Sequence, residues 1–414
     1  MKRQLCVSVL LCAVLHISSS GAGAQQPGYQ SPPLMLKSAD FVPAALLTGA
    51  DYRVAEEVKN DGLVNEYSVK DPAGSAAIES TQALMIYIKE RTALENIQKI
   101  SKSDEFKEAF KKAGLGPYNT AKGLVTEPVD TVKKIGTGIG RWFSDVGTSI
   151  VSKDPNQPSV AKTALGQAAA KRMFAYRLDV NPYTANKELQ DKLDELAWVS
   201  FAGGLTVKAA FAAIPDMPGT VISLSSTSDS MKKKVRDKSP AELHSINKKA
   251  LLAMGVTPQL ADEFLNNYLF DPYDKALIVG ALESMQGVQN RSVFIWNCFG
   301  VKDRSVALFA RQQAECMAAY ASAEKSITRM VDIQGKTFLR TGDNSVVGVF
   351  PLDYIAWTEN LDQKERLFSA AIEKIKGVTG RRLIVYGKVD PRARAVLEQR
   401  GWGIAEKKSL ITAP

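Results

Sequence analysis

The sequence predicts an α+β protein with a mainly α-helical body, an N-terminal β-hairpin and a small C-terminal α/β domain. Three observations lead to this prediction. Two short β-prone runs flank an Asn-Asp-Gly turn at residues 60–62. Apolar residues then recur at helical spacing as far as about residue 326. After about residue 328, strand patterns alternate with helix patterns, which favours some parallel pairing.

After the first 24 residues, which are discussed below, residues 25–33 are rich in Pro and Gln and are predicted to form a disordered leader. The β-prone runs at 52–58 and 63–69 predict the hairpin. Thr81 then caps a helix that extends to Lys112 and ends at Gly114. We therefore expect a leader and hairpin over 25–80 and a helical body over 81–328.

Helix starts in the body repeat a capping residue followed by proline at the first helical position. These pairs are Glu127-Pro128, Ser239-Pro240, Thr257-Pro258 and Asp271-Pro272. Residues 216–238 are instead rich in Pro, Ser and Thr and then basic, which is typical of an exposed linker with a solvated basic face.

The C-terminal domain is predicted over 329–414. Strand patterns occur at 337–339, 346–350 and 382–386, and helix patterns at 360–376 and 391–400. A last short strand is expected at 402–406.

The first 24 residues have the layout of a secretory signal peptide. Lys2 and Arg3 precede an apolar run at 5–17, and small residues at 22–24 predict cleavage after Ala24. A retained anchor is the alternative, but this run is short for a bilayer of ~30 Å. Leu11 stands before Cys12 where a lipoprotein needs a small residue. We therefore expect a soluble periplasmic or extracellular protein that is not a lipoprotein.

Composition narrows the classes of function. The 414 residues include 53 Lys and Arg against 44 Asp and Glu, a formal net charge of +9, and the basic residues are mixed with acids along the chain. This mixing argues against nucleic acid as a partner. The excess suits an anionic envelope surface or simply gives solubility. His244 would be the one histidine left after signal cleavage, so we expect no metal site and no cofactor.

Cys298 and Cys316 would also remain in the exported chain. Export favours a disulfide, but Cys298 lies near a predicted turn and Cys316 lies 13 residues into the following helix, roughly 20 Å along its axis. Disulfide Cα atoms must come within ~7 Å of each other. The spacing therefore favours two buried free thiols.

Two glycine motifs superficially resemble nucleotide-binding loops. Gly335-Lys336-Thr337 ends like a phosphate-binding loop, but Met330 stands at the position of its first glycine. The glycines at 136, 138 and 140 are followed by Arg141 and have no preceding strand. We therefore predict no nucleotide site, and a turn into a strand at residue 335.

A turn from a strand into a helix near residue 390 is the best candidate for a small-molecule site. A helix N-terminus there would carry free amides and a positive dipole. Three basic side chains add charge, which predicts an anion site at Lys388, Arg392 and Arg394. The alternative is purely structural, because Asp390 can cap the same amides.

Two apolar segments are candidates for contact with a membrane or a partner. Residues 129–150 form an amphipathic, glycine-bearing pattern that is also compatible with core packing. Its apolar face includes Ile135, Ile139, Trp142, Phe143 and Val146. Residues 196–214 are long enough to span a bilayer, but Lys208 and two adjacent glycines favour a helix buried in the body.

Three segments resemble parts of a family of uncharacterised exported bacterial proteins. They are GLVTEPVDTVKKIGTGIGRWF, LDVNPYTANKELQDKLDELAWVSFAGGL, and the tail from FPLDYIAWT to LEQRGWGIAEK. The resemblance covers most of the exported chain. It implies a helical body followed by a C-terminal α/β piece, and it implies no activity, ligand or catalytic residue.

These observations predict an exported envelope protein that binds a protein partner or an anionic membrane surface without catalysis. The alternative is a hydrolase or transferase whose site uses carboxylates and tyrosine and lacks histidine. A deep pocket with two carboxyl groups of raised pKa would favour the enzyme. A long apolar groove with a basic rim, or a large exposed apolar patch, would favour binding.

Overall fold

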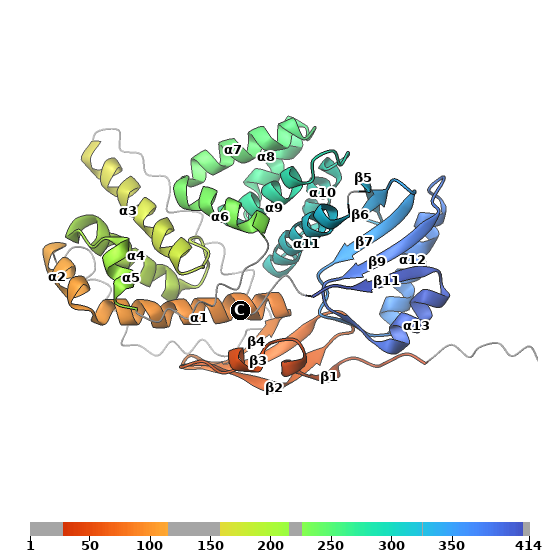
Figure 1. Cartoon of the computed structure of the whole chain (residues 1–414), viewed down its shortest axis with the longest axis horizontal. Helices are drawn as coiled ribbons and strands as arrows, with labels where there is room; N and C mark the ends of the chain where they lie inside the picture. The colour runs from red at the N-terminus through yellow and green to blue at the C-terminus, as the bar shows by residue number, and fades with distance from the viewer. Residues whose placement is uncertain (1–27, 115–157, 215–225, 325, 409–414) are drawn as a thin grey trace, which may run out of the picture.

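The computed structural model describes residues 28–114, 158–214, 226–324 and 326–408 (Figure 1). It confirms the α+β class, with an antiparallel sheet near the N-terminus, a helical body and a mixed sheet near the C-terminus. The signal peptide, the Glu127-Pro128 helix start and the amphipathic segment 129–150 lie outside the described residues.

The N-terminal sheet has four antiparallel strands in the order β1-β2-β3-β4. They are β1 (Leu34–Lys37), β2 (Arg53–Asn60), β3 (Asn65–Asp71) and β4 (Gly74–Glu79). β2 and β3 form the predicted hairpin, but its turn lies at residues 61–64, where the Asp61 carboxylate accepts hydrogen bonds from the backbone amides of Leu63 and Val64. The hairpin is therefore the centre of a larger sheet.

The described part of the predicted leader is ordered, so the expectation of disorder is wrong from Gly28 onward. The backbone N–H of Gln30 donates to the Trp357 carbonyl at 2.7 Å, and the Trp357 N–H donates to the Gln30 side chain at 2.9 Å. The Tyr29 hydroxyl donates to Asp362 at 2.7 Å. These contacts with the C-terminal domain supply the order that the local sequence does not predict.

The helix expected over 81–112 is two helices, α1 (Thr81–Lys102) and α2 (Asp104–Lys112). Ser103 is extended and its hydroxyl accepts the Phe106 N–H, so it ends one helix and caps the next. The first cap is Ser80 rather than Thr81, because the Ser80 hydroxyl accepts the Ala83 N–H. In Figure 1, α1 extends from the N-terminal sheet to the group formed by α2, α4 and α5.

Residues 196–214 do not form one buried helix as predicted. They contain the end of α4 (Lys187–Gly203), a break and the short α5 (Val207–Ala212). Gly204 has a left-handed backbone with φ 77°, and the Thr206 hydroxyl then accepts the Ala209 N–H to start α5. A continuous helix is therefore interrupted at the second of the two glycines.

Two details of this segment follow the expectation. Lys208 is exposed, and Gly203 packs against α2, where an added Cβ would lie 2.0 Å from the Ala109 carbonyl oxygen. Among the residues that the structure describes, no helix is both long enough and apolar enough to cross a membrane.

The remaining body helices include one in the described part of the expected linker, whose residues 216–225 lie outside the described ranges. This helix is α6 (Ser226–Asp237), in which Met231 and Val235 are buried and Lys232 forms an ion pair with Asp179. The basic run is therefore not simply a solvated face. The predicted starts at residues 239–240, 257–258 and 271–272 are confirmed by α7 (Pro240–Ala253), α8 (Pro258–Asn266) and α9 (Pro272–Ser284). α3 (Pro158–Arg177) packs on α4 and α6.

The last two helices of the described body are α10 (Ser292–Asn297) and α11 (Arg304–Ala323). Asp303 caps α11, since its carboxylate accepts the Val306 N–H at 2.9 Å. Cys298 and Cys316 are free and buried, which confirms the prediction of two buried thiols.

The C-terminal sheet has five strands in the order β11-β9-β7-β6-β5. β7 (Ser345–Phe350), β9 (Gly380–Val385) and β11 (Trp402–Glu406) run parallel, and β5 (Ile327–Ile333) and β6 (Lys336–Thr341) add an antiparallel edge. The short β8 (Tyr354–Ile355) and β10 (Lys388–Val389) pair separately. The strands expected in this domain are confirmed, as are its two helices, α12 (Glu359–Glu373) and α13 (Pro391–Gln399).

Both faces of this sheet are covered. Alternate side chains point to opposite faces of a strand, and neighbours such as Val346 and Val347 accordingly belong to different clusters. Val347 packs with Cys316 and Met317 of α11, whereas Val346 packs with side chains of α12 and α13. α11 therefore joins the helical body to the C-terminal sheet.

Candidate functional site

The sheet opens between β6 and β7. These strands pair only at Leu339–Val347 and Arg340–Val346, whereas β7 pairs with β9 along its whole length. Beyond Leu339 the two strands diverge, which leaves backbone groups of β7 without a ladder partner. Gln313 of α11 compensates, because its side-chain amide donates to the Val349 carbonyl at 3.2 Å.

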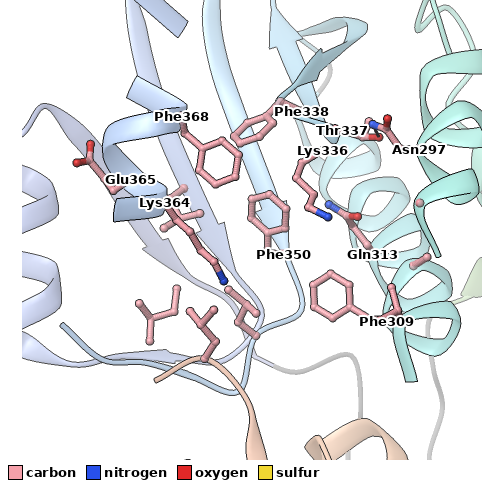
Figure 2. Close-up of a pocket in the computed structure, with 18 of the residues that line it drawn as sticks. Asn297, Phe309, Gln313, Lys336, Thr337, Phe338, Phe350, Lys364, Glu365 and Phe368 are labelled. Carbon is pink, nitrogen blue, oxygen red and sulfur yellow. Dashed lines mark hydrogen bonds between the residues drawn. The ribbon is translucent and has the colours of Figure 1, made fainter. Parts of the chain in front are cut away.

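A cavity of about 310 Å³ lies at this opening, between α10, α11, β6, β7 and α12. Its size falls within the range of small-molecule sites. Five phenylalanines from these five elements line it: Phe294, Phe309, Phe338, Phe350 and Phe368. Figure 2 labels all of them except Phe294.

Gly348 of β7 leaves space for the aromatic wall. A Cβ at this position would lie 2.8 Å from the rings of Phe338 and Phe350. The Phe338 ring in turn has its centroid 5.5 Å from those of Phe350 and Phe368. These edge-on contacts are a favourable arrangement for aromatic rings and hold the wall in place.

The rim of the cavity is basic. Lys336 of β6 and Lys364 of α12 are both exposed lining residues, and Figure 2 shows their side chains on either side of the Phe350 ring. Within the described parts of the chain, neither ammonium group has a carboxylate within 4.0 Å. The polar groups deeper in the wall are satisfied, since the Asn297 amide donates to the Thr337 hydroxyl at 3.0 Å.

Glu365 is the acidic residue in the cavity lining, and it is fully engaged. Its carboxylate accepts hydrogen bonds from Arg400 at 2.5 Å, from the Trp402 indole at 2.9 Å and from Ser369. Burial would raise the pKa of Glu365, but these hydrogen bonds outweigh burial and hold it below its usual range. Glu365 is therefore an anchored carboxylate and is poorly suited to proton transfer at neutral pH.

Cys298 is the thiol in the lining. Its complete burial raises the pKa of the thiol, so the reactive thiolate is disfavoured. The described lining contains no histidine that could activate this thiol. The cavity therefore offers shape and charge for binding, with no nucleophile–base pair among its lining residues.

A second cavity, of about 210 Å³, lies on the other side of α11 and is polar. Asp274, which is completely buried, bridges Arg304 and Arg311. Asp179 similarly bridges Lys89 of α1 and Lys232 of α6. These ion pairs join α1, α6, α9, α11 and the segment between α3 and α4.

Glu90 of α1 is a further carboxyl group in the wall of the polar cavity. Burial raises the pKa of Glu90, against the opposing effect of hydrogen bonds from Thr184 and Asn186. Asp353 is a second carboxyl group with a raised pKa, about 6, because it is desolvated at the contact with the N-terminal sheet. Its carboxylate accepts the N–H groups of Asn65 and Thr81. The two groups lie at different places, so they do not form the paired carboxylates expected of the enzyme alternative.

The predicted anion-site residues have separate partners. The Lys388 ammonium lies 5.3 Å from the centre of the Phe41 ring, Arg392 donates to the Gly28 carbonyl, and Arg394 pairs with Glu406 at 2.7 Å. The carboxylate of Asp390 accepts the N–H groups of Arg392 and Ala393. The structure therefore does not bring the three basic groups to one point, and anion binding there stays a prediction.

Three further predictions concern the turn at Gly335, the histidine His244 and the metal ligands. Gln334 and Gly335 have φ of 54° and 71° and form the turn between β5 and β6, as expected from the sequence. His244 is half-buried on α7. Within the described residues, no group of three His, Cys, Asp or Glu side chains is placed to hold a metal ion.

Sequence reasoning missed the apolar cavity. Its five phenylalanines are far apart in the sequence and fit ordinary core patterns within each element. One available signal is Gly348 within the apolar strand 345–350, since a glycine inside a strand often marks a close approach of other groups. Lys336 stands out in the sequence only as part of the incomplete phosphate-loop motif at residues 335–337.

Comparison with known proteins gives no match, because no family model, no curated protein and no solved structure is significantly similar to the chain. The resemblance to exported bacterial proteins therefore stays a prediction.

Proposed function

We propose that this chain is an exported, non-catalytic binding protein of the cell envelope, and that its cavity between β6 and β7 holds the apolar part of an acidic amphiphile. The observation that supports this proposal is the combination of an aromatic cavity of about 310 Å³ with two lysines at its rim. An apolar wall with a basic rim favours binding of a ligand over catalysis.

The interior of the cavity suits a hydrocarbon or aromatic group. Transfer of such a group from water to an apolar wall is favourable by about 0.8 kcal/mol for each buried methylene. The phenylalanine rings of the wall come from five elements, and the Phe338 ring is held by contacts with the rings of Phe350 and Phe368. The cavity is therefore preformed, and a ligand would not have to order it.

The rim of the cavity suits an anionic head group. Lys336 and Lys364 come from different elements, and both line the cavity, on either side of Phe350 (Figure 2). Each is a mobile point charge on a flexible stem, so together they can attract a carboxylate or a phosphate without demanding one geometry. An acid in the wall would oppose an anionic ligand, but Glu365 is already neutralised by Arg400.

The test uses an environment-sensitive fluorescent fatty acid and the chain without its first 24 residues. Binding should be saturable, and Ala310→Phe should weaken it strongly, because Ala310 lines the cavity and a phenyl ring there takes up ligand space. Ala323→Phe is the matched control, since this alanine is exposed at the end of the same helix.

Thermal unfolding of both variants checks that they are folded. If the fatty acid does not bind, or if Ala310→Phe binds it as tightly as the unmodified chain does, the cavity is not the site and the proposal fails. Native mass spectrometry of protein purified from an envelope extract should also show an acidic amphiphile bound to the unmodified chain.

A further inference from the structure

An exposed aromatic corner lies beside the mouth of the apolar cavity. Trp296 is 64% exposed and Phe299 is 45% exposed, and their ring centroids are 5.8 Å apart. Both residues are close in sequence to residues that line the cavity, namely Asn297, Cys298 and Gly300. Val306, which is 40% exposed, lines the same cavity from α11. We call Trp296, Phe299 and Val306 the aromatic corner.

The surroundings of the aromatic corner are basic. Lys302 is exposed in the loop between Phe299 and Val306, and Lys336 and Lys364 lie at the rim of the cavity. The nearest acid in sequence, Asp303, is occupied as the cap of α11, since it accepts hydrogen bonds from Ser305 and Val306. The corner therefore combines exposed apolar rings with lysines that can meet external anions.

We propose that the aromatic corner docks on an anionic lipid bilayer, so that the mouth of the cavity faces the membrane from which the amphiphile enters. This inference rests on the proposed function. Tryptophan is favoured at the boundary between lipid and water, because its ring is apolar and its N–H is polar. Lysines around such rings are attracted to anionic head groups.

A bilayer fits these observations better than a protein partner does. The ligand proposed for the cavity is itself a membrane component, and the corner adjoins the entrance that such a ligand would use. A protein interface is typically depleted of lysine around its core, whereas this corner has lysine at several adjoining positions. A peripheral contact also needs no membrane-spanning helix.

The experiment measures co-sedimentation of the chain lacking its first 24 residues with two kinds of vesicle. One kind is phosphatidylcholine alone, and the other contains about one third phosphatidylglycerol. Binding should require the anionic lipid and should weaken as salt is added. The double variant Trp296→Ser, Phe299→Ser should bind about tenfold more weakly.

Leu165→Ser is the matched control, because Leu165 is also 64% exposed but lies on α3, far from α10 in Figure 1. It should bind vesicles as the unmodified chain does. Both variants change exposed side chains, so their thermal unfolding should be unchanged.

A second measurement separates this inference from the proposed function. The double variant should still bind the fluorescent fatty acid in solution with unchanged affinity, and only its uptake from anionic vesicles should slow. Vesicle binding that is absent, or that the double variant does not weaken, overturns docking on a bilayer even if the fatty acid binds. Selective capture of an envelope protein through Trp296, with no vesicle binding, would replace the bilayer with a protein partner. If the unmodified chain does not bind the fatty acid, the proposed function is overturned instead.

Discussion

The two faces of α11 border two different cavities. Val306, Phe309, Ala310 and Gln313 line the apolar cavity, whereas Arg304, Leu308 and Arg311 line the polar one. Both sets recur at intervals of three or four residues, as a helix requires for two distinct faces. A single helix thus separates two different cavities. The rim lysines of the apolar cavity have no carboxylate partner among the described residues, whereas the charges of the polar cavity are paired.

The difference between the cavities is one of charge pairing. In the polar cavity each bridging carboxylate meets two cations, and the groups are mostly removed from water. Buried charges in such a network mainly compensate one another's desolvation, so the network fixes the packing of four helices. The apolar cavity instead presents two rim lysines that have no carboxylate partner among the described residues. Charge alone therefore does not mark the binding site, whereas unpaired charge beside apolar volume does.

The largest effect on stability is expected for Asp274→Ala. This change removes the carboxylate that Arg304 and Arg311 share. Arg304 would keep its pair with Asp271, and Arg311 would keep the longer contact with Glu315, so two largely buried cations would be poorly compensated. The free energy of unfolding should fall by about 3–5 kcal/mol in urea titrations. Asp262→Ala is the control, because its ion pair with Lys248 is well exposed and should contribute less than about 1 kcal/mol. Loss of fatty-acid binding by folded Asp274→Ala would show that the two cavities are not independent.

A smaller loss is expected for Gln313→Leu, on the other face of α11. Leucine keeps the apolar contacts but removes the donor to the Val349 carbonyl, which lies where β6 and β7 diverge. A buried carbonyl without a partner should cost about 1–2 kcal/mol of unfolding free energy. Gln313→Asn tests the length of the side chain, and it should destabilise the protein similarly because its amide cannot reach. A neutral result for both variants would mean that water or relaxation satisfies the carbonyl.

The outline of the fold could be predicted because local signals determine it. Ser239, Thr257 and Asp271 predict helix starts through short-range capping, and all three side chains accept the expected N–H groups. The strands β6, β7, β9 and β11 of the C-terminal sheet likewise follow from local sequence patterns, whereas β5 was not predicted. These signals act within a few residues and do not depend on tertiary packing.

The segments whose structure differs from the prediction depend on contacts between residues that are distant in sequence. Residues 28–30 are ordered by Trp357 and Asp362, and α6 is held by Met231 and the pair of Lys232 with Asp179. The apolar cavity could not be predicted for the same reason. It exists only because two strands diverge after a single short ladder, which no pattern within either strand indicates.

The third prediction concerns the pH dependence of Glu90 in the polar cavity. Burial raises the pKa of Glu90 above its usual value of 4.5, so the folded chain keeps this proton to higher pH than the unfolded chain does. The contribution to stability is therefore complete below pH 4.5 and is lost as pH rises through the folded-state pKa.

Glu90→Gln should remove this dependence. The difference in unfolding free energy between the unmodified chain and the variant should decrease as pH rises above 4.5. Asp353 titrates near pH 6 in both proteins, so its effect cancels in the difference. Urea midpoints measured at several pH values test the sign. A difference that grows with pH would mean that the nearby Arg304 and the hydrogen bonds to Glu90 stabilise its charged form more than burial destabilises it.

The smallest effect on stability is expected at the rim lysines, where the effect on binding should nevertheless be clear. Lys336→Gln and Lys364→Gln alter exposed side chains, so the unfolding free energy should change by less than about 0.5 kcal/mol. Each change should weaken binding of a fatty acid about fivefold, as expected for the loss of roughly 1 kcal/mol of charge attraction at a partly exposed site. Binding of the alcohol with the same chain should not change, since it has no charge. Lys208→Gln on α5 serves as the exposed control. Equal losses for the acid and the alcohol would mean that the lysine stems contribute apolar contacts, and the basic rim would then not select the head group.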